Sequence, residues 1–153
     1  MIRLAIIFNR RKLSGWLTRF WTGCYAYHVA WVDEEAGLMW DMHLIRRRRA
    51  WPHYGEGEVL LFDVPEAAVT HDYLEDRLQS DEHRYGVLDY ALFALRPIYH
   101  LLGLSTPNAR GVICSEMINV DIHACGGRTP WPPNDAPPSP CDFYRWLSLA
   151  SGP

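Results

Sequence analysis

Two strand-like runs joined by a short turn do most to constrain the fold of this 153-residue chain. The run YAYHVAWV, residues 25–32, is rich in aromatic and β-branched side chains, and so is typical of a strand. LMWDMHLI, residues 38–45, is a second such run, and the turn-forming stretch DEEAG, residues 33–37, separates the two. This pattern predicts a β-hairpin and therefore an antiparallel sheet.

The remaining elements divide between strands in the first half and helices in the second. Further strands are predicted at residues 2–8 and 58–64, the latter as a third strand of the hairpin's sheet. Helices are predicted at residues 12–21, 66–83, 85–95, 114–124 and 141–149. This segregation predicts a single α+β domain over residues 1–153, with a small antiparallel sheet packed against helices.

Composition narrows the class of protein. A formal net charge of -3 argues against a nucleic-acid partner. No uncharged stretch reaches the roughly 18 residues of a membrane helix, so no transmembrane segment is expected. The run Arg46–Arg49 could contact phosphate or anionic lipid, but a solvated strand end or loop is the favoured interpretation.

The cysteines indicate a reducing setting. There is no CxxC pair and no disulfide-like density, so no disulfide is expected and a cytoplasmic location fits best. No cofactor is implied. The residues that could ligate zinc match no compact metal motif in their spacing, so no metal is expected either; they are Cys24, His28, His43, His123 and Cys125.

Polar side chains on the hairpin form a candidate site. Side chains two residues apart on a strand share a face, so Asp41 and His43 point the same way. Pairing across the turn places His28 opposite residues 41–43, so either Asp41 or His43 could be its direct neighbour. An Asp beside a His can fix the imidazole's tautomer for base chemistry. A satisfied core histidine is the alternative.

A cysteine at a helix start is the second candidate. Cys114 lies in the first turn of the predicted helix 114–124, which Gly126 and Gly127 end. The partial positive charge at a helix N-terminus stabilises thiolate, the reactive form of cysteine. Cys125 lies at the opposite end, where the dipole works against a thiolate. The alternative is that Cys114 is a small buried hydrophobe.

These motifs, in this order, resemble a known family. YHVAWV, then Y-x-x-x-D-Y, then ICSEMI ending at CGG, and finally SPCDFYRW look like the circularly permuted branch of the NlpC-type papain-like superfamily. YiiX-like and YaeF-like proteins belong to this branch. In ordinary members the cysteine helix precedes the histidine strand, whereas here the histidine strand comes first. The resemblance covers most of the chain.

The resemblance implies a papain-like, circularly permuted fold and thiol chemistry. By this match Cys114 is the nucleophile, His28 the general base, and Asp41 the residue that orients His28, with His43 as the alternative third residue. Tyr85 corresponds to a tyrosine that lines the site near the oxyanion position. The sequence has HVA where the family usually has HVG, and relatives more often carry His or Glu at the third position.

The implied function is a cysteine hydrolase, an amidase or peptidase that cleaves an amide or ester bond through an acyl-enzyme. Its substrate would be a small-molecule, peptide or lipid-like acyl compound. An acyltransferase or lipid-ester hydrolase of the same fold is one alternative, and a non-catalytic binding module is another. The residues do not indicate the oligomeric state.

Overall fold

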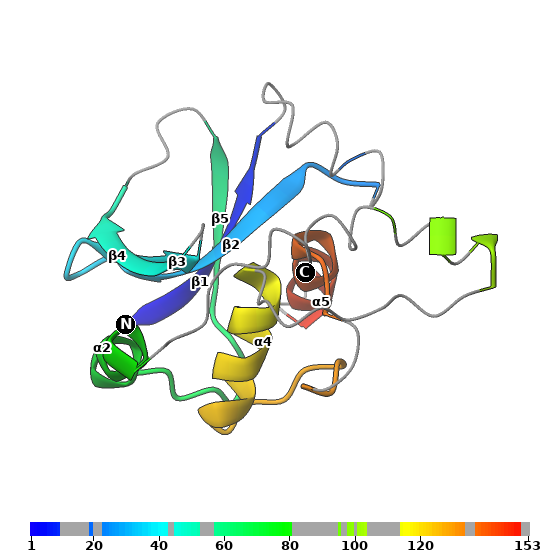
Figure 1. The fold of residues 1–153 in the computed structure, drawn as a ribbon. Helices are drawn as coiled ribbons and strands as arrows, with labels where there is room; N and C mark the ends of the chain where they lie inside the picture. Colours follow the sequence, from blue (N-terminus) through cyan, green and yellow to red (C-terminus); the bar gives the residue numbers. More distant parts are fainter. Residues whose placement is uncertain are drawn as a thin grey trace.

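The fold is built on a five-stranded antiparallel sheet (Figure 1). In this computed structural model the strands are β1 (Ile2–Phe8), β2 (Ala26–Asp33), β3 (Leu38–Met42), β4 (Arg46–Ala50) and β5 (Glu58–Phe62). Their spatial order is β4-β3-β2-β1-β5. The structure describes residues 1–9, 19, 23–42, 45–52, 57–80, 95, 98–99, 101–103, 114–133 and 137–150.

The predicted hairpin is present as β2 and β3. Val32 pairs with Met39 in an antiparallel register, and the turn between the strands holds Gly37 at φ 64°. That left-handed backbone conformation favours glycine. The second strand of the hairpin, β3, ends at Met42, and the edge strand β4 begins at Arg46. The run interpreted as a solvated strand end or loop, Arg46–Arg49, forms the edge strand β4. Arg48 is exposed, as that interpretation expects, but Arg46 is buried, which corrects it for that residue.

The strand predicted at 58–64 is present as β5 and belongs to the same sheet as the hairpin, as predicted, although it pairs with neither hairpin strand. It pairs with β1 on the side opposite β2, in the register Ala5 to Leu61. β1 is therefore internal to the sheet, and its residues Leu4 to Ile7 are completely buried. A near-continuous apolar strand is what burial on both faces requires.

Three helices are present among the described residues. α2 (His71–Ser80) is shorter than the predicted helix 66–83. The chain before it holds Glu66 at φ 62°, outside the helical region, and the Thr70 Oγ1 accepts a hydrogen bond from the Tyr73 backbone N–H at 3.2 Å. Thr70 is thus an N-cap, which sets the start of the helix. Residues 81–83 lie outside the described part.

α4 (Cys114–Ala124) has the predicted bounds. Its end is set by Gly126 at φ 84°, with a hydrogen bond from the Gly127 N–H to the Ile122 carbonyl at 2.9 Å. This is the left-handed glycine cap that the two glycines predicted.

α5 (Pro140–Ala150) extends one residue beyond the prediction at each end. Ser139 and Asp142 cap it reciprocally: the Ser139 Oγ accepts from the Asp142 N–H at 3.1 Å, and the Asp142 carboxylate accepts from the Ser139 N–H at 2.8 Å. Proline at the first helical position is compatible with such a cap.

The helices cover one face of the sheet. In Figure 1, α4 and α5 lie beside each other against β2, and α2 lies near β4. These elements enclose the main core, which contains apolar side chains of the sheet and all three helices. The predicted α+β class is confirmed. The main-core side chains include Leu4, Ile6, Trp31, Trp40, Leu74, Met117, Ile118, Phe143 and Leu147.

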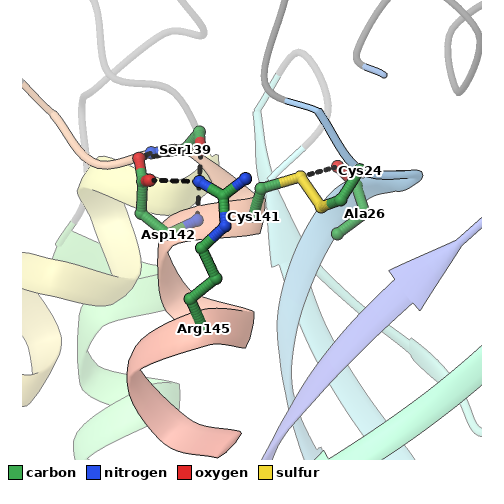
Figure 2. The surroundings of a disulfide bond; sticks show 6 residues. All are labelled: Cys24, Ala26, Ser139, Cys141, Asp142 and Arg145. Atoms are coloured by element: carbon green, nitrogen blue, oxygen red, sulfur yellow. Dashed lines mark hydrogen bonds and ion pairs between the residues drawn. A yellow bond between two sulfur atoms is a disulfide. The ribbon is translucent and has the colours of Figure 1, made fainter. Parts of the chain in front are cut away.

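A disulfide joins Cys24 to Cys141, which corrects the expectation that none would form (Figure 2). The two residues are 117 positions apart in the sequence, and the bond connects the segment before β2 to the first turn of α5. The spacing pattern gave no sign of it, because only the packing of α5 on β2 brings the two thiols together. Among the described residues, Cys114 and Cys125 are free thiols.

Two of the predicted helices, at 12–21 and 85–95, fall on positions that lie almost entirely outside the described residues. Within the described part of the chain, no helix has the length and apolar character needed to span a membrane.

Candidate active site

His28 and Asp41 are brought together in the interior. His28 is only 5% exposed and Asp41 is fully buried. The His28 Nε2 lies 3.6 Å from the Asp41 Oδ2, an ion-pair distance slightly longer than a hydrogen bond. Such contacts in unliganded sites often tighten when substrate binds.

The sheet register explains this meeting. β2 and β3 pair from Asp33–Leu38 to Trp31–Trp40. In an antiparallel ladder of this register, Asp41 and His28 are diagonal neighbours on the same face of the sheet. His43 lies outside the described residues, so its competition with Asp41 for the third position stays a prediction. The structure brings Asp41 to His28.

Cys114 lies at the first position of α4 and is 6% exposed. Its helix packs against β2, the strand that carries His28. The apolar residues Met117, Ile118 and Ile122 hold α4 against the sheet, so that the thiol is at the tip of a fixed helix. At a helix start the first backbone N–H groups have no partner within the helix, and their partial positive charge lies near a side chain at the first position.

The electrostatics of His28 reflect both neighbours. Burial lowers its pKa, but the charges of Cys114 and Asp41, with hydrogen bonding to Cys114, outweigh burial and raise the pKa from 6.5 to about 9. The imidazole is therefore held as an imidazolium at neutral pH, between a carboxylate and a sulfur.

Tyr27 is part of the same cluster, although sequence reasoning did not select it. Its ring stacks on that of His28, with centroids 6.2 Å apart and planes at 29°. Burial, followed by the charges of Asp41 and Cys114, raises the pKa of its hydroxyl. The β1–β2 register shifts next to Tyr27, because Ile7 pairs with His28 but Phe8 pairs with Ala26. Such a bulge can re-aim a side chain near a site.

Tyr85, the tyrosine expected near the oxyanion position, lies outside the described residues. Its role stays a prediction.

Asp41 also binds two arginines from the edge strand. The Arg47 Nε donates a hydrogen bond to the Asp41 Oδ1 at 3.2 Å, and the Arg49 Nη2 lies 3.3 Å from the Oδ2. Asp41 faces Arg47 directly across the β3–β4 ladder. Three cationic or potentially cationic groups thus surround one buried carboxylate. The run of four arginines was the available signal, but their partners lie on other elements.

A second buried carboxylate fixes α4 to the rest of the protein. Asp121 is fully buried, and the Arg46 guanidinium binds both of its oxygens at 3.1 and 3.2 Å. The Trp31 indole N–H and the Tyr73 hydroxyl donate further hydrogen bonds to it at 3.1 and 3.0 Å. β4, β2 and α2 therefore all hold the helix that begins at Cys114.

The other free thiol has a different setting. Burial and then the charge of Asp121 raise the pKa of Cys125, which disfavours its thiolate. This agrees with its place just beyond the C-terminal end of α4, where the dipole opposes negative charge. Of the two free cysteines among the described residues, only Cys114 has a histidine partner in the structure.

No group of three or more His, Cys, Asp or Glu side chains in the described ranges is arranged to hold a metal ion. Comparisons with protein-family models, with curated protein sequences and with solved structures found no match.

Proposed function

We propose that the protein is a cysteine hydrolase that cleaves an amide or ester bond through an acyl-enzyme. In this proposal Cys114 is the nucleophile, His28 is the general base and acid, and Asp41 is the positioning residue for His28. The observation that supports it most is a buried imidazole on β2 between the sulfur at the start of α4 and the carboxylate of Asp41.

The order of the elements supports a place in the circularly permuted NlpC-type papain-like group. The histidine strand β2 precedes the cysteine helix α4 in the chain, and α4 packs against that strand. The sheet carrying the histidine is antiparallel and small. The motif resemblance and this arrangement lead to the same family, which is part of the proposal.

The proposed chemistry follows from the charges at the site. The Cys114 thiolate attacks the carbonyl carbon, and backbone N–H groups at the start of α4 stabilise the oxyanion. The His28 imidazolium gives its proton to the leaving amine or alcohol, leaving an acyl thioester on Cys114. His28 then takes a proton from water, which attacks the thioester, releases the acid and restores the thiolate. Asp41 keeps the imidazole oriented throughout.

Trapping the acyl-enzyme tests this proposal. The full chain is mixed with p-nitrophenyl acetate, nitrophenol release is followed by absorbance, and the acetylated peptide is identified by mass spectrometry. The expected result is a burst of nitrophenol with the acetyl group on Cys114. His28→Ala should lose at least about 100-fold in acylation rate, the usual contribution of a general base.

Matched controls separate this result from general thiol reactivity. Cys125→Ser should keep the burst, and Cys114→Ser should lose it. Equal acetylation of Cys114 in the native and His28→Ala proteins would contradict the proposal and favour a non-catalytic binding module. Chromogenic amides and long-chain acyl esters then distinguish an amidase or peptidase from a lipid-ester hydrolase or acyltransferase.

A cytoplasmic location stays a prediction of the sequence. The Cys24–Cys141 disulfide bears on it directly, because structural disulfides are uncommon in reducing compartments. Alkylating protein in intact cells before lysis tests the location. Free Cys24 and Cys141 would support the cytoplasm, and a formed disulfide would favour an oxidising compartment.

A further inference from the structure

The four arginines of β4 divide between the two faces of the sheet. Arg46 and Arg48 point to the helical side, where Arg46 binds Asp121 and Arg48 binds Glu75 at 2.9 Å. The other two arginines, opposite Asp41 and Met39 in the β3–β4 ladder, share the face of Asp41. Half of the run is thus directed at the candidate active site.

Within the described ranges, positive charge exceeds negative charge around Asp41 on that face. Among the described residues, Asp41 is the one carboxylate that Arg47 and Arg49 both approach, at 3.2 and 3.3 Å. When His28 and Cys114 form an imidazolium–thiolate pair, their charges cancel. Two guanidinium groups then face a single carboxylate, which leaves one positive charge in excess beside the pair.

The N–H donors of the Arg49 guanidinium group indicate where the excess positive charge lies. The Arg49 side chain is 16% exposed, and neither its Nε nor its Nη2 makes a hydrogen bond to an acceptor within the described ranges, both atoms being buried. The 3.3 Å contact with Asp41 is an ion pair without hydrogen-bond geometry. Buried N–H groups without acceptors are unfavourable, and such groups call for a further acceptor.

Arg47 provides an accessible counterpart. In the described part of the chain, the Arg47 Nε is the atom that donates a hydrogen bond to Asp41. The Arg47 side chain is 40% exposed and is therefore partly accessible to solvent. Guanidinium groups bind carboxylate and phosphate through paired N–H donors, which a lysine cannot do.

We infer that Arg47 and Arg49 bind an anionic group of the acyl substrate, a carboxylate or a phosphate, beside the His28–Asp41 pair. This inference depends on the proposed hydrolase function and adds the substrate class to it. The substrate would carry its negative charge a short distance from the carbonyl that Cys114 attacks.

Charged and neutral alkylating agents test the inference on the full chain. The probes are N-chloroacetyl-β-alanine, which carries a carboxylate, 2-(chloroacetamido)ethylphosphonate, and neutral N-propyl chloroacetamide. Second-order rates are measured at Cys114 in a Cys125→Ser background and divided by the rates for a small free thiol. An anionic probe should be favoured over the neutral one by about 10-fold or more at low salt, and less at high salt.

Four variants identify the source of this preference. Arg47→Gln and Arg49→Gln should each reduce it several-fold, whereas Arg48→Gln, on the same strand but the opposite face, should leave it unchanged. Arg49→Lys keeps the charge without the paired donors, and it should retain only part of the preference. If Arg49→Gln does not fold, the native ratio, its salt dependence and the other variants still decide. The faster of the two anionic probes distinguishes a carboxylate from a phosphate.

The inference is overturned if the native protein shows no anionic preference, or if Arg47→Gln, Arg49→Gln and Arg48→Gln leave it equally intact. Its failure differs from failure of the proposed function. A Cys114 that reacts rapidly with the neutral probe in a His28-dependent way, but without anionic preference, contradicts only the inference. A Cys114 with no His28-dependent reactivity contradicts both.

Discussion

Arg46, on the edge strand β4, binds both carboxylate oxygens of Asp121, on the helix that begins with the proposed nucleophile. Asp121 lies two helical turns from Cys114 on α4. The ion pair is buried, and Trp31 and Tyr73 complete the hydrogen bonds of the carboxylate. The position of Cys114 relative to β2 therefore depends on polar contacts as well as on apolar packing.

Removing Arg46 should strongly destabilise the protein. Arg46→Met leaves the Asp121 charge buried without its bidentate partner, and we expect a loss of about 3–5 kcal/mol in the free energy of unfolding. Urea denaturation followed by tryptophan fluorescence measures it. Arg48→Met removes an exposed arginine from the same strand and should change stability by less than about 1 kcal/mol. Equal effects of the two substitutions would show that the Arg46–Asp121 pair has no special role.

The disulfide should be both detectable and stabilising. Without reductant, the denatured protein should expose two reactive thiols, Cys114 and Cys125, and four after reduction. Cys141→Ser should lower the free energy of unfolding by about 2–5 kcal/mol under oxidising conditions, because the bond closes a long loop. Cys125→Ser is the control and should cost much less. Four reactive thiols in protein purified without reductant would mean that the bond does not form.

Stability should decline between neutral and alkaline pH because of His28. The folded protein holds the His28 proton more tightly than the unfolded chain does, with a pKa of about 9 against 6.5. The resulting stabilisation is complete below pH 6.5 and is lost as the pH rises through 9. Its size should be on the order of 1–3 kcal/mol. Urea denaturation at pH 6, 7.5 and 9 should show this loss, and His28→Gln should show a smaller one. An identical pH profile for the variant would argue against a raised pKa.

Residues close together in the sequence were enough to predict the hairpin turn and the bounds of α4. Gly37 in the hairpin turn and Gly126 after α4 both adopt the left-handed backbone conformation that favours glycine. The turn and the end of α4 could therefore be predicted from the positions of these glycines. Strand alternation placed both Asp41 and His43 near His28, but it did not decide between them. Cys114 followed from the helix start.

Long-range contacts were not readable from the sequence. Cys24 and Cys141 meet only because α5 packs on β2, and their separation of 117 positions carries no spacing signal. The arginines of β4 looked like a solvated charge run because their partners, Asp41, Glu75 and Asp121, lie on three other elements. Tyr27 was overlooked because neighbouring residues on a regular strand point to opposite faces, whereas the β1–β2 register shifts next to Tyr27 and its ring stacks on that of His28.

The pH dependence of Cys114 alkylation tests the central claim most directly. Rates with iodoacetamide are measured from pH 5 to 9 in the Cys125→Ser background, with and without His28→Ala, and with His123→Ala as a control on the same helix. An unperturbed thiol titrates near pH 8.5 and reacts slowly at pH 6. A Cys114–His28 pair should give fast reaction at pH 6 in the native protein and in His123→Ala, and this reaction should be lost in His28→Ala. The same slow rate at pH 6 with and without His28 would contradict a Cys114–His28 pair.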